Sequence, residues 1–218
     1  MAKTVILGCS SLKIYIEEAQ KKVQTNFPVI YLNRLYHRDP REMREHILEA
    51  LAGLDKEVET VLVAMGCCGG SWKDVKVPCR VVIPKIDECV SLLLQTTDQV
   101  SPDLKEPGHL YVRDRDPKKE NFRSIFERLT RDMDEDGQQR CKEAWQRSYH
   151  EIDIIDTGIN DCRKPEYIRE VQKDADWLGA RLAFVDGGTY LLEKLFSGKW
   201  DEQFTLLEAG MRLEDTEP

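Results

Sequence analysis

Residues 60–70, TVLVAMGCCGG, join a short apolar run to two adjacent cysteines and two glycines. A brief, largely β-branched apolar run is typical of a strand buried on both faces of a parallel sheet. Similar runs recur at 4–8, 28–32, 80–84, 109–113, 151–156 and 181–186. Helical patterns separate most of them, at 11–24, from Asp39-Pro40 onward, and at 87–95, 118–149, 165–178 and 189–197. This alternation predicts an α/β fold of parallel-sheet βαβ units.

The order of these elements predicts two similar Rossmann-like lobes. The stretch 98–108, rich in proline and charge, is the predicted hinge between an N-terminal α/β lobe (1–97), which has Cys-rich strand ends, and a C-terminal α/β lobe (109–218). The long charged helical region 118–149 is expected to break at Gly137. Residues 204–210 form either a last strand or an extended tail.

The composition excludes several functional classes. The 218 residues are 41% hydrophobic and 33% charged, enough to bury a core without disulfides. The net charge is -8 and no Lys/Arg stripe occurs, so we expect no nucleic-acid partner. No apolar window is long enough to span a membrane, and the N-terminal apolar stretch is too short for a signal peptide. We therefore expect a cytoplasmic protein, in which seven Cys are thiols, metal ligands or core residues.

Four cysteines follow predicted strand ends. In open α/β sheets, ligands bind beyond the carboxyl ends of the strands, and Cys9, Cys67, Cys68 and Cys89 all lie at or just past such ends. The sequence thus predicts that these thiols meet at one sheet edge. Cys79 and Cys141 are expected to lie elsewhere. No CxxC pair occurs, so spacing alone does not indicate a metal site.

Two glycine pairs and one histidine could complete a site. Gly69-Gly70 and Gly187-Gly188 could present backbone N–H groups to a cofactor or small anion, but a tight strand-to-helix turn explains them equally well. Neither stretch is a nucleotide-binding fingerprint. His37 is a candidate metal ligand or general acid/base; its alternative role is to brace the helix start beside Asp39.

Several segments in order resemble an uncharacterised prokaryotic family, the domain of unknown function 1638. Its Leu-His-x-x-Pro element is matched by Tyr36–Pro40 and its Gly-x-Cys-Gly segment by Gly66–Gly69. A Pro-Arg-x-His-Asp-Cys-hydrophobic segment corresponds to Pro84–Val90, and the ending Leu-x-x-Leu-x-x-Gly-x-Trp-Asp to Leu192–Asp201. The N-terminal strand that ends in Cys corresponds to Cys9.

The resemblance implies a Cys/His-centred site made of Cys9, His37, Cys68 and Cys89. It also implies an association with corrinoid-dependent methyltransferases of anaerobes, and so with one-carbon metabolism. The chain departs from the family pattern in three places. Asp87 replaces a family His, Cys67 is an extra thiol, and a Thr-Pro-Gly-Trp element is absent near Val112.

Three hypotheses follow. The first is a thiolate-bound metal or metallocofactor (zinc, an iron–sulfur cluster or a corrinoid), with a small-molecule or cofactor ligand and corrinoid methyltransferase components as partners. The second is a metal-free enzyme with a Cys nucleophile or acid/base. The third is a regulatory module that binds a small anion. The DxHxxG corrinoid motif does not occur.

The adjacent thiols Cys67 and Cys68 should point in different directions and have different roles. Successive side chains of an extended segment point to opposite faces, so only one of the pair can face the site. The family match favours Cys68 as the functional thiol. Cys67 is then expected to point into the core or to support the site from behind.

Overall fold

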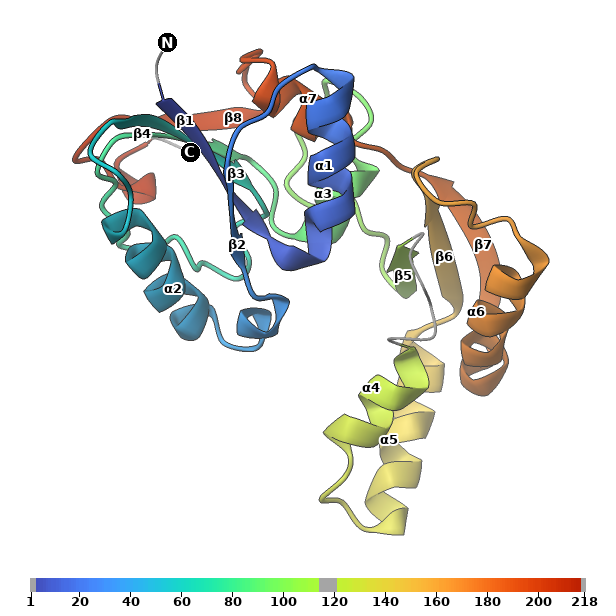
Figure 1. The fold of residues 1–218 in the computed structure, drawn as a ribbon. Coiled ribbons are helices and arrows are strands. Elements are labelled where there is room, and N and C mark those ends of the chain that lie inside the picture. Colours follow the sequence, from blue (N-terminus) through green and yellow to red (C-terminus); the bar gives the residue numbers. More distant parts are fainter. Residues whose placement is uncertain (1–2, 114–120, 217–218) are drawn as a thin grey trace. The chain divides into compact units, whose positions relative to one another are not determined.

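Two sheets organise the described residues of the computed structural model, which are 3–113 and 121–216 (Figure 1). Each sheet belongs to its own compact unit. The first unit combines Met1–Leu104 with Thr189–Pro218, and the second is Lys105–Gly188. The parallel α/β architecture expected from the sequence is confirmed.

The first unit contains a five-stranded sheet in the order β2-β1-β3-β4-β8. Its strands are β1 (Lys3–Cys9), β2 (Val29–Leu32), β3 (Val58–Ala64), β4 (Arg80–Pro84) and β8 (Phe204–Leu207). The first four are parallel, whereas β8 pairs antiparallel with β4. Apolar residues of the central strands β1 and β3 are nearly all buried, as expected for a parallel sheet covered on both faces.

Helices cover both faces of this sheet. They are α1 (Lys13–Lys22), α2 (Pro40–Ala52), α3 (Cys89–Leu94) and α7 (Tyr190–Phe196), with 3-10 turns η1 (Ser10–Leu12), η2 (Arg34–Arg38) and η4 (Leu213–Asp215). The chain moves from β1 outward to β2 and then back across to β3, so right-handed crossovers place α1 and α2 on opposite faces (Figure 1). The strand order therefore reverses between β1 and β3, and ligand sites in such sheets lie beyond the carboxyl ends at that point.

Helix α2 begins where the Asp39-Pro40 pair predicted a helix start. The Asp39 carboxylate accepts a hydrogen bond from the Arg41 N–H at 2.9 Å, and Pro40 occupies the first helical position. Met43, Ile47 and Leu51 form the buried face of the helix. Because Asp39 bonds Arg41, it does not depend on His37 for a partner.

The second unit contains a smaller, fully parallel sheet in the order β5-β6-β7. Its strands are β5 (His109–Arg113), β6 (Glu151–Asp156) and β7 (Arg181–Asp186), and its helices are α4 (Phe122–Leu129), α5 (Glu135–Ser148) and α6 (Pro165–Leu178). Both crossovers move in the same direction, which places these helices on one face. Their shared core contains Ile152, Ile154, Val171, Ala175 and Leu178.

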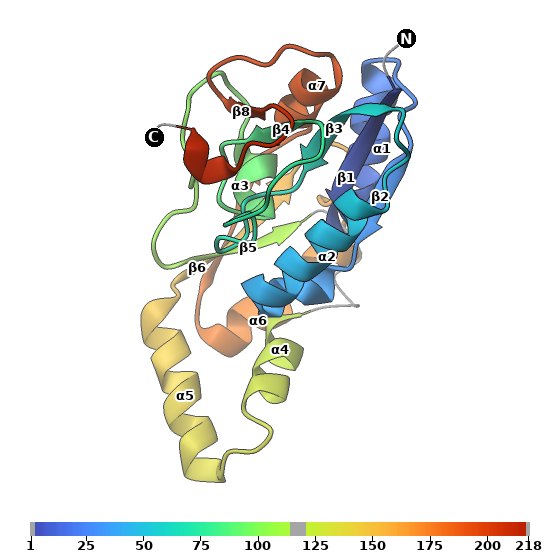
Figure 2. The ribbon, with the colours of Figure 1, turned by 90° about the vertical axis from the view of Figure 1, so that its left-hand side faces the viewer.

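Helices α4 and α5 lie side by side (Figures 1 and 2). The break between them is not at Gly137, as the sequence suggested, because Gly137 lies in the first turn of α5. Its N–H donates to the Asp134 side chain at 2.8 Å, so Asp134 caps the helix and the break falls at 130–134. Residues 118–120 of the expected helical region lie outside the described residues.

The chain divides differently from the sequence expectation. The first boundary is at Leu104, within the predicted hinge, but residues 189–218 belong to the first unit and not to a C-terminal lobe. The physical reason is that β8 completes the edge of the first sheet and α7 packs on α1 and α3. The second sheet is fully parallel and the first is parallel except for β8, and among the described residues only the first sheet has helices on both faces.

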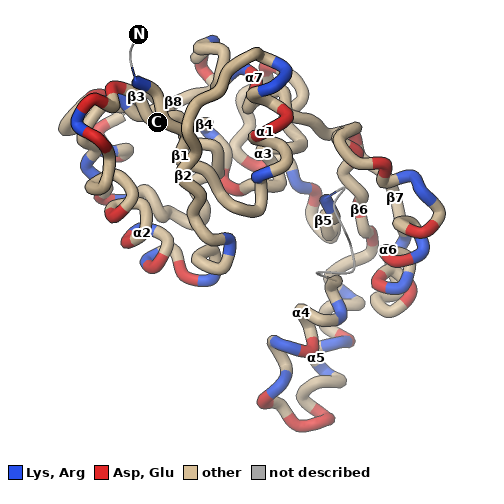
Figure 3. Tube along the Cα trace, viewed as in Figure 1, with Lys and Arg blue, Asp and Glu red and all other residues tan. Residues whose placement is uncertain are grey.

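Charge is mixed along the helices. Lys/Arg and Asp/Glu positions alternate along α5 and α6 (Figure 3). Among the described residues, no helix combines the length and apolarity that crossing a lipid bilayer requires.

Candidate metal centre

The carboxyl edge of the first sheet brings together three of the four predicted ligands. Cys9 ends β1, His37 lies in η2 after β2, and Cys89 begins α3 after β4. One ligand atom from each residue lies within 4.8 Å of the other two. Since parallel strands end at the same edge, residues far apart in sequence meet there without any short motif.

Cys9 is fixed by the turn that follows it. Its backbone is extended and its sulfur caps η1, where the Ser11 N–H donates to Sγ at 3.4 Å. The Ser11 hydroxyl lies 3.0 Å from the same sulfur. Ser11 was not singled out in the sequence, although its position two residues past a strand-end Cys is a signal for such a contact.

His37 faces Cys9 directly. Its Nε2 lies 3.1 Å from Cys9 Sγ. The turn that carries His37 is held by the Asn33 side chain, which accepts from Leu35 N–H, and by the Arg34 N–H, which donates to the Ser10 hydroxyl at 3.0 Å. The bond to Ser10 ties the loop after β2 to the loop after β1. Together the two bonds fix the turn that carries the imidazole.

Cys89 is positioned by a close approach of two backbones. The Cys67 N–H donates to the Ile86 carbonyl at 2.8 Å, and the Cys68 N–H donates to the Asp87 carbonyl at 2.7 Å. Gly66 lies so close to the segment that precedes Cys89 that an added Cβ would be 2.5 Å from the Glu88 Cα. Glycine is therefore required at 66 by space.

The three groups share protons. A hydrogen bond with Cys89 and burial raise the pKa of Cys9 to about 12, against the lowering effect of His37 and Ser11. Hydrogen bonds with Cys89 and then Cys9 raise the pKa of His37 to about 10, because the sulfur atoms stabilise the protonated imidazole. Cys9 is 0% exposed and Cys89 is 8% exposed, whereas His37 is exposed, so the imidazole forms the outer side of the group.

Cys68 is not a member of this group. Its backbone is left-handed (φ 47°), so the argument from alternating side chains of an extended segment was wrong for this turn. Gly69 and Gly70 continue the turn with φ 70° and 83°. Cys67 is half-buried, and burial followed by the Asp87 charge raises its pKa to about 11.

The remaining predicted positions lie in different places. Cys79 and Cys141 are outside the group, in agreement with the sequence, and Cys162 is buried in the core of the second unit. Gly69-Gly70 belong to the first unit and Gly187-Gly188 to the second. The Gly187 N–H already donates to the Asp156 carbonyl at 3.0 Å, so it is engaged in the turn after β7. A binding role for the glycine pairs stays a prediction.

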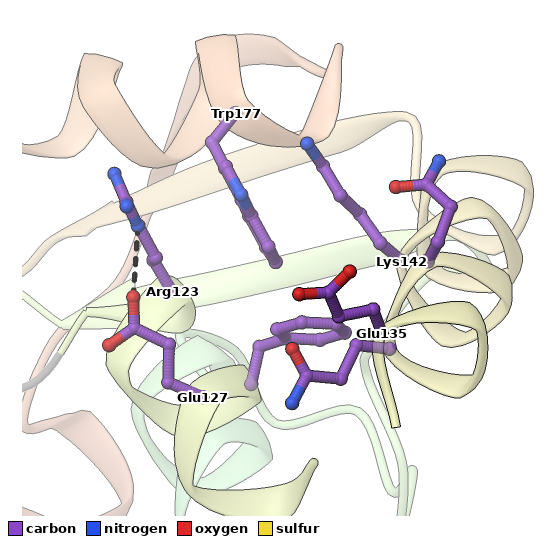
Figure 4. A pocket seen from close by; sticks show the side chains of 8 residues that line it. Arg123, Glu127, Glu135, Lys142 and Trp177 are labelled. Carbon is purple, nitrogen blue, oxygen red and sulfur yellow. Dashed lines mark hydrogen bonds and ion pairs between the residues drawn. The ribbon is translucent and has the colours of Figure 1, made fainter. Parts of the chain in front are cut away.

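A pocket of about 270 Å³ lies in the second unit and not at these thiols (Figure 4). Its lining comprises Arg123, Phe126, Glu127, Glu135, Gln138, Gln139, Lys142 and Trp177. The Lys142 ammonium lies 5.4 Å from the Trp177 ring centroid, and Arg123 pairs with Glu127 at 3.1 Å. None of the predicted site residues lines this pocket.

The profile of the family described as "Protein of unknown function (DUF1638)" matches residues 31–196. The chain belongs to this family. The range matched to DUF1638 includes His37, Cys68 and Cys89 and begins after Cys9. No curated protein and no solved structure matches the chain.

Proposed function

We propose that the first unit binds a thiolate-preferring metal ion, zinc foremost, through Cys9, His37 and Cys89. The supporting observation is that two thiols and one imidazole have ligand atoms within 4.8 Å of one another. Thiolates select soft or borderline metals, and imidazole suits zinc. The position beyond the strand ends of a doubly wound sheet is where such folds bind ligands.

The spacing fits a tetrahedral ion after small adjustments. With Zn–S and Zn–N bonds of about 2.3 and 2.0–2.1 Å, two sulfurs lie about 3.8 Å apart and sulfur and nitrogen about 3.5 Å apart. Cys9 Sγ and His37 Nε2 are 3.1 Å apart, and no pair in the group exceeds 4.8 Å. Shifts of about an ångström or less, within reach of side-chain rotation, complete the geometry.

Three protein ligands leave a coordination position open. Two Cys and one His with an open position are a known ligand set of catalytic zinc, which lowers the pKa of a bound water or holds an anionic substrate atom. In this chain Ser11 would donate hydrogen bonds to the Cys9 sulfur and so limit the charge on that ligand. His37, at the exposed side, would separate the ion from solvent.

Other cofactors fit less well. An iron–sulfur cluster is held by four protein ligands, so Cys68 or another residue would have to join the group. A corrinoid, and a place in one-carbon metabolism beside methyltransferase components, stays a proposal supported by the family resemblance. We also propose that the site binds a small-molecule or cofactor ligand. We propose that the protein is cytoplasmic, because a reducing compartment keeps its seven cysteines free, as they are in this structure.

A second candidate is a metal-free enzyme with Cys89 as nucleophile. A specific observation favours it: ligand atoms of His37 and Cys89 lie within 4.8 Å of each other, and hydrogen bonds with Cys89 and then Cys9 raise the pKa of His37 to about 10. Cysteine nucleophiles use such an arrangement. Cys9 is less suited to this role, because it is fully buried and its pKa is raised to about 12.

Metal content separates the two candidates. The wild type, Cys89→Ser and the control Cys79→Ser are purified anaerobically, analysed for metals and titrated with zinc against a chelator. We expect about one ion per chain in the wild type and control, and affinity lowered about a hundredfold or more in Cys89→Ser, because a ligand is lost. A wild type that binds no zinc, iron or cobalt but whose Cys89 is rapidly alkylated at neutral pH would contradict the metal site and favour the nucleophile.

A further inference from the structure

A second cluster of ligand atoms lies on the sheet of the second unit. His109 is the first residue of β5 and Glu151 the first of β6, and the two are opposite each other in the parallel register. Asp153 follows two residues along β6, so it lies on the same face as Glu151. One ligand atom from each of these three residues lies within 4.8 Å of the others.

This cluster is poorly exposed. The side chains of His109, Glu151 and Asp153 are 14%, 13% and 8% exposed. His109 Nδ1 lies 2.7 Å from Asp153 Oδ2, and Glu151 pairs with Arg181. Carboxylates that are largely withdrawn from water require a nearby cation, and among the described residues Asp153 pairs with the His109 imidazole alone.

We propose that His109, Glu151 and Asp153 form a second metal site, for a hard to borderline divalent cation such as Mn²⁺. Carboxylate oxygens suit Mn²⁺, and imidazole is acceptable to it and to neighbouring first-row ions. The set contains no sulfur, which makes it the chemical opposite of the group at Cys9.

The observed spacing is compatible with octahedral coordination. Adjacent ligand atoms of an octahedral ion with bonds of about 2.1 Å are about 3.0 Å apart, whereas those of tetrahedral zinc are about 3.3 Å apart. The 2.7 Å hydrogen bond between His109 Nδ1 and Asp153 Oδ2 needs only a small separation to reach the octahedral value. An ion bound there would replace the proton now shared by this pair.

A further carboxylate is placed to orient the imidazole. Glu106 Oε2 lies 3.6 Å from His109 Nε2, on the side of the ring away from Asp153. Metal-bound histidines commonly donate their second N–H to a carboxylate, which fixes the tautomer. The Glu106 N–H donates to the Tyr111 hydroxyl at 2.9 Å, which holds that residue near the imidazole.

Manganese itself is the probe that tests the proposal. The full chain is titrated with Mn²⁺ and free Mn²⁺ is followed by electron paramagnetic resonance, because hard Mn²⁺ has little affinity for the thiol group in the first unit. The variants are Asp153→Asn and Glu151→Gln, with Asp176→Asn, an exposed position on α6, as the matched control. A thermal unfolding curve of each variant verifies folding.

We expect one Mn²⁺ per wild-type chain, unchanged binding in Asp176→Asn and in Cys89→Ser, and affinity weakened about tenfold or more in Asp153→Asn. If Asp153→Asn does not fold, the loss is expected in Glu151→Gln, because Glu151 is at the start of its strand. A wild type that binds no Mn²⁺, or Mn²⁺ binding that survives in both folded variants, overturns the proposal and leaves these residues as an ion-pair network.

Discussion

The two ligand clusters differ in chemistry and in how the fold assembles them. The group at Cys9 combines thiols and an imidazole from a strand end, a 3-10 turn and a helix start at the carboxyl edge of a sheet covered on both faces. The cluster at His109 combines one imidazole with two carboxylates near the starts of two adjacent strands. Loops let distant residues converge, whereas a strand register fixes which residues face each other. The comparison teaches that one chain can gather a soft and a hard set of potential ligand atoms by two independent structural routes.

Crossed metal binding gives the largest expected effect. Cys9→Ser should weaken Cd²⁺ binding about a hundredfold or more and leave Mn²⁺ binding unchanged, and Asp153→Asn should do the reverse, because donor softness decides which ion each cluster holds. Isothermal titration with each ion measures both affinities. If either variant weakens both ions equally, the clusters are not independent and the comparison fails.

The close contact between Gly66 and the Glu88 backbone gives the second-largest expected effect. Gly66→Ala places a methyl group about where the Glu88 backbone lies, and such overpacking costs about 1–3 kcal/mol of unfolding free energy. It should also displace Cys89 and weaken Cd²⁺ binding, with Mn²⁺ binding unchanged. Denaturant unfolding measures the stability. Gly53→Ala, where the nearest atom would be 3.4 Å away, is the control, and an equal loss in both variants would contradict the spatial argument.

Much of the first site could be anticipated because parallel strands end at one edge. Cys9, His37 and Cys89 follow three predicted strand ends, and the strand runs and the Asp39-Pro40 helix start were correct. Cys68 could not be placed, because its turn is set by the contact of Gly66 with the Glu88 backbone. The contact joins two segments that are distant in the chain, and no local sequence pattern specifies how close they lie.

The pairing of segments that are far apart in the chain also could not be predicted from the sequence. The return of β8 to the edge of the first sheet depends on antiparallel pairing with β4, so the sequence predicted residues 204–210 only as a strand or a tail. His109 and Asp153 had no visible partner in the sequence, because their contact depends on the register of β5 against β6. Hydrophobic patterns identify strands, but they do not specify which strand lies beside which.

The hydrogen bonds from Ser11 should have a smaller effect. Ser11→Ala removes the hydroxyl 3.0 Å from Cys9 Sγ, and groups that support a ligand from behind typically change metal affinity about 10–100-fold. We expect the lower end of this range, because the backbone N–H of residue 11 still donates to the sulfur. Competition with a chelator measures the change. Ser124→Ala, in the second unit, should leave the affinity unchanged; a Ser11→Ala affinity equal to the wild type would remove Ser11 from the site.

The thiol next to the site should be unreactive. Since the pKa of Cys67 is raised to about 11, only about one part in a thousand is thiolate at pH 8, and alkylation should be slower than in the unfolded chain by about a hundredfold. The rate should rise about tenfold per pH unit up to about pH 10, because only the thiolate reacts. Peptide mapping after timed alkylation measures it. Rapid, pH-independent modification of Cys67 in the folded chain would contradict its assignment as a half-buried thiol with a raised pKa outside the ligand set.

X-ray absorption at the zinc edge tests the central claim most directly. For protein loaded with one zinc ion per chain, Cys9, His37 and Cys89 predict two sulfurs at about 2.3 Å, one imidazole nitrogen at about 2.0–2.1 Å and one further light atom. Three sulfurs would mean that Cys68 joins the site on binding. A shell of oxygen and nitrogen atoms without sulfur would contradict the account.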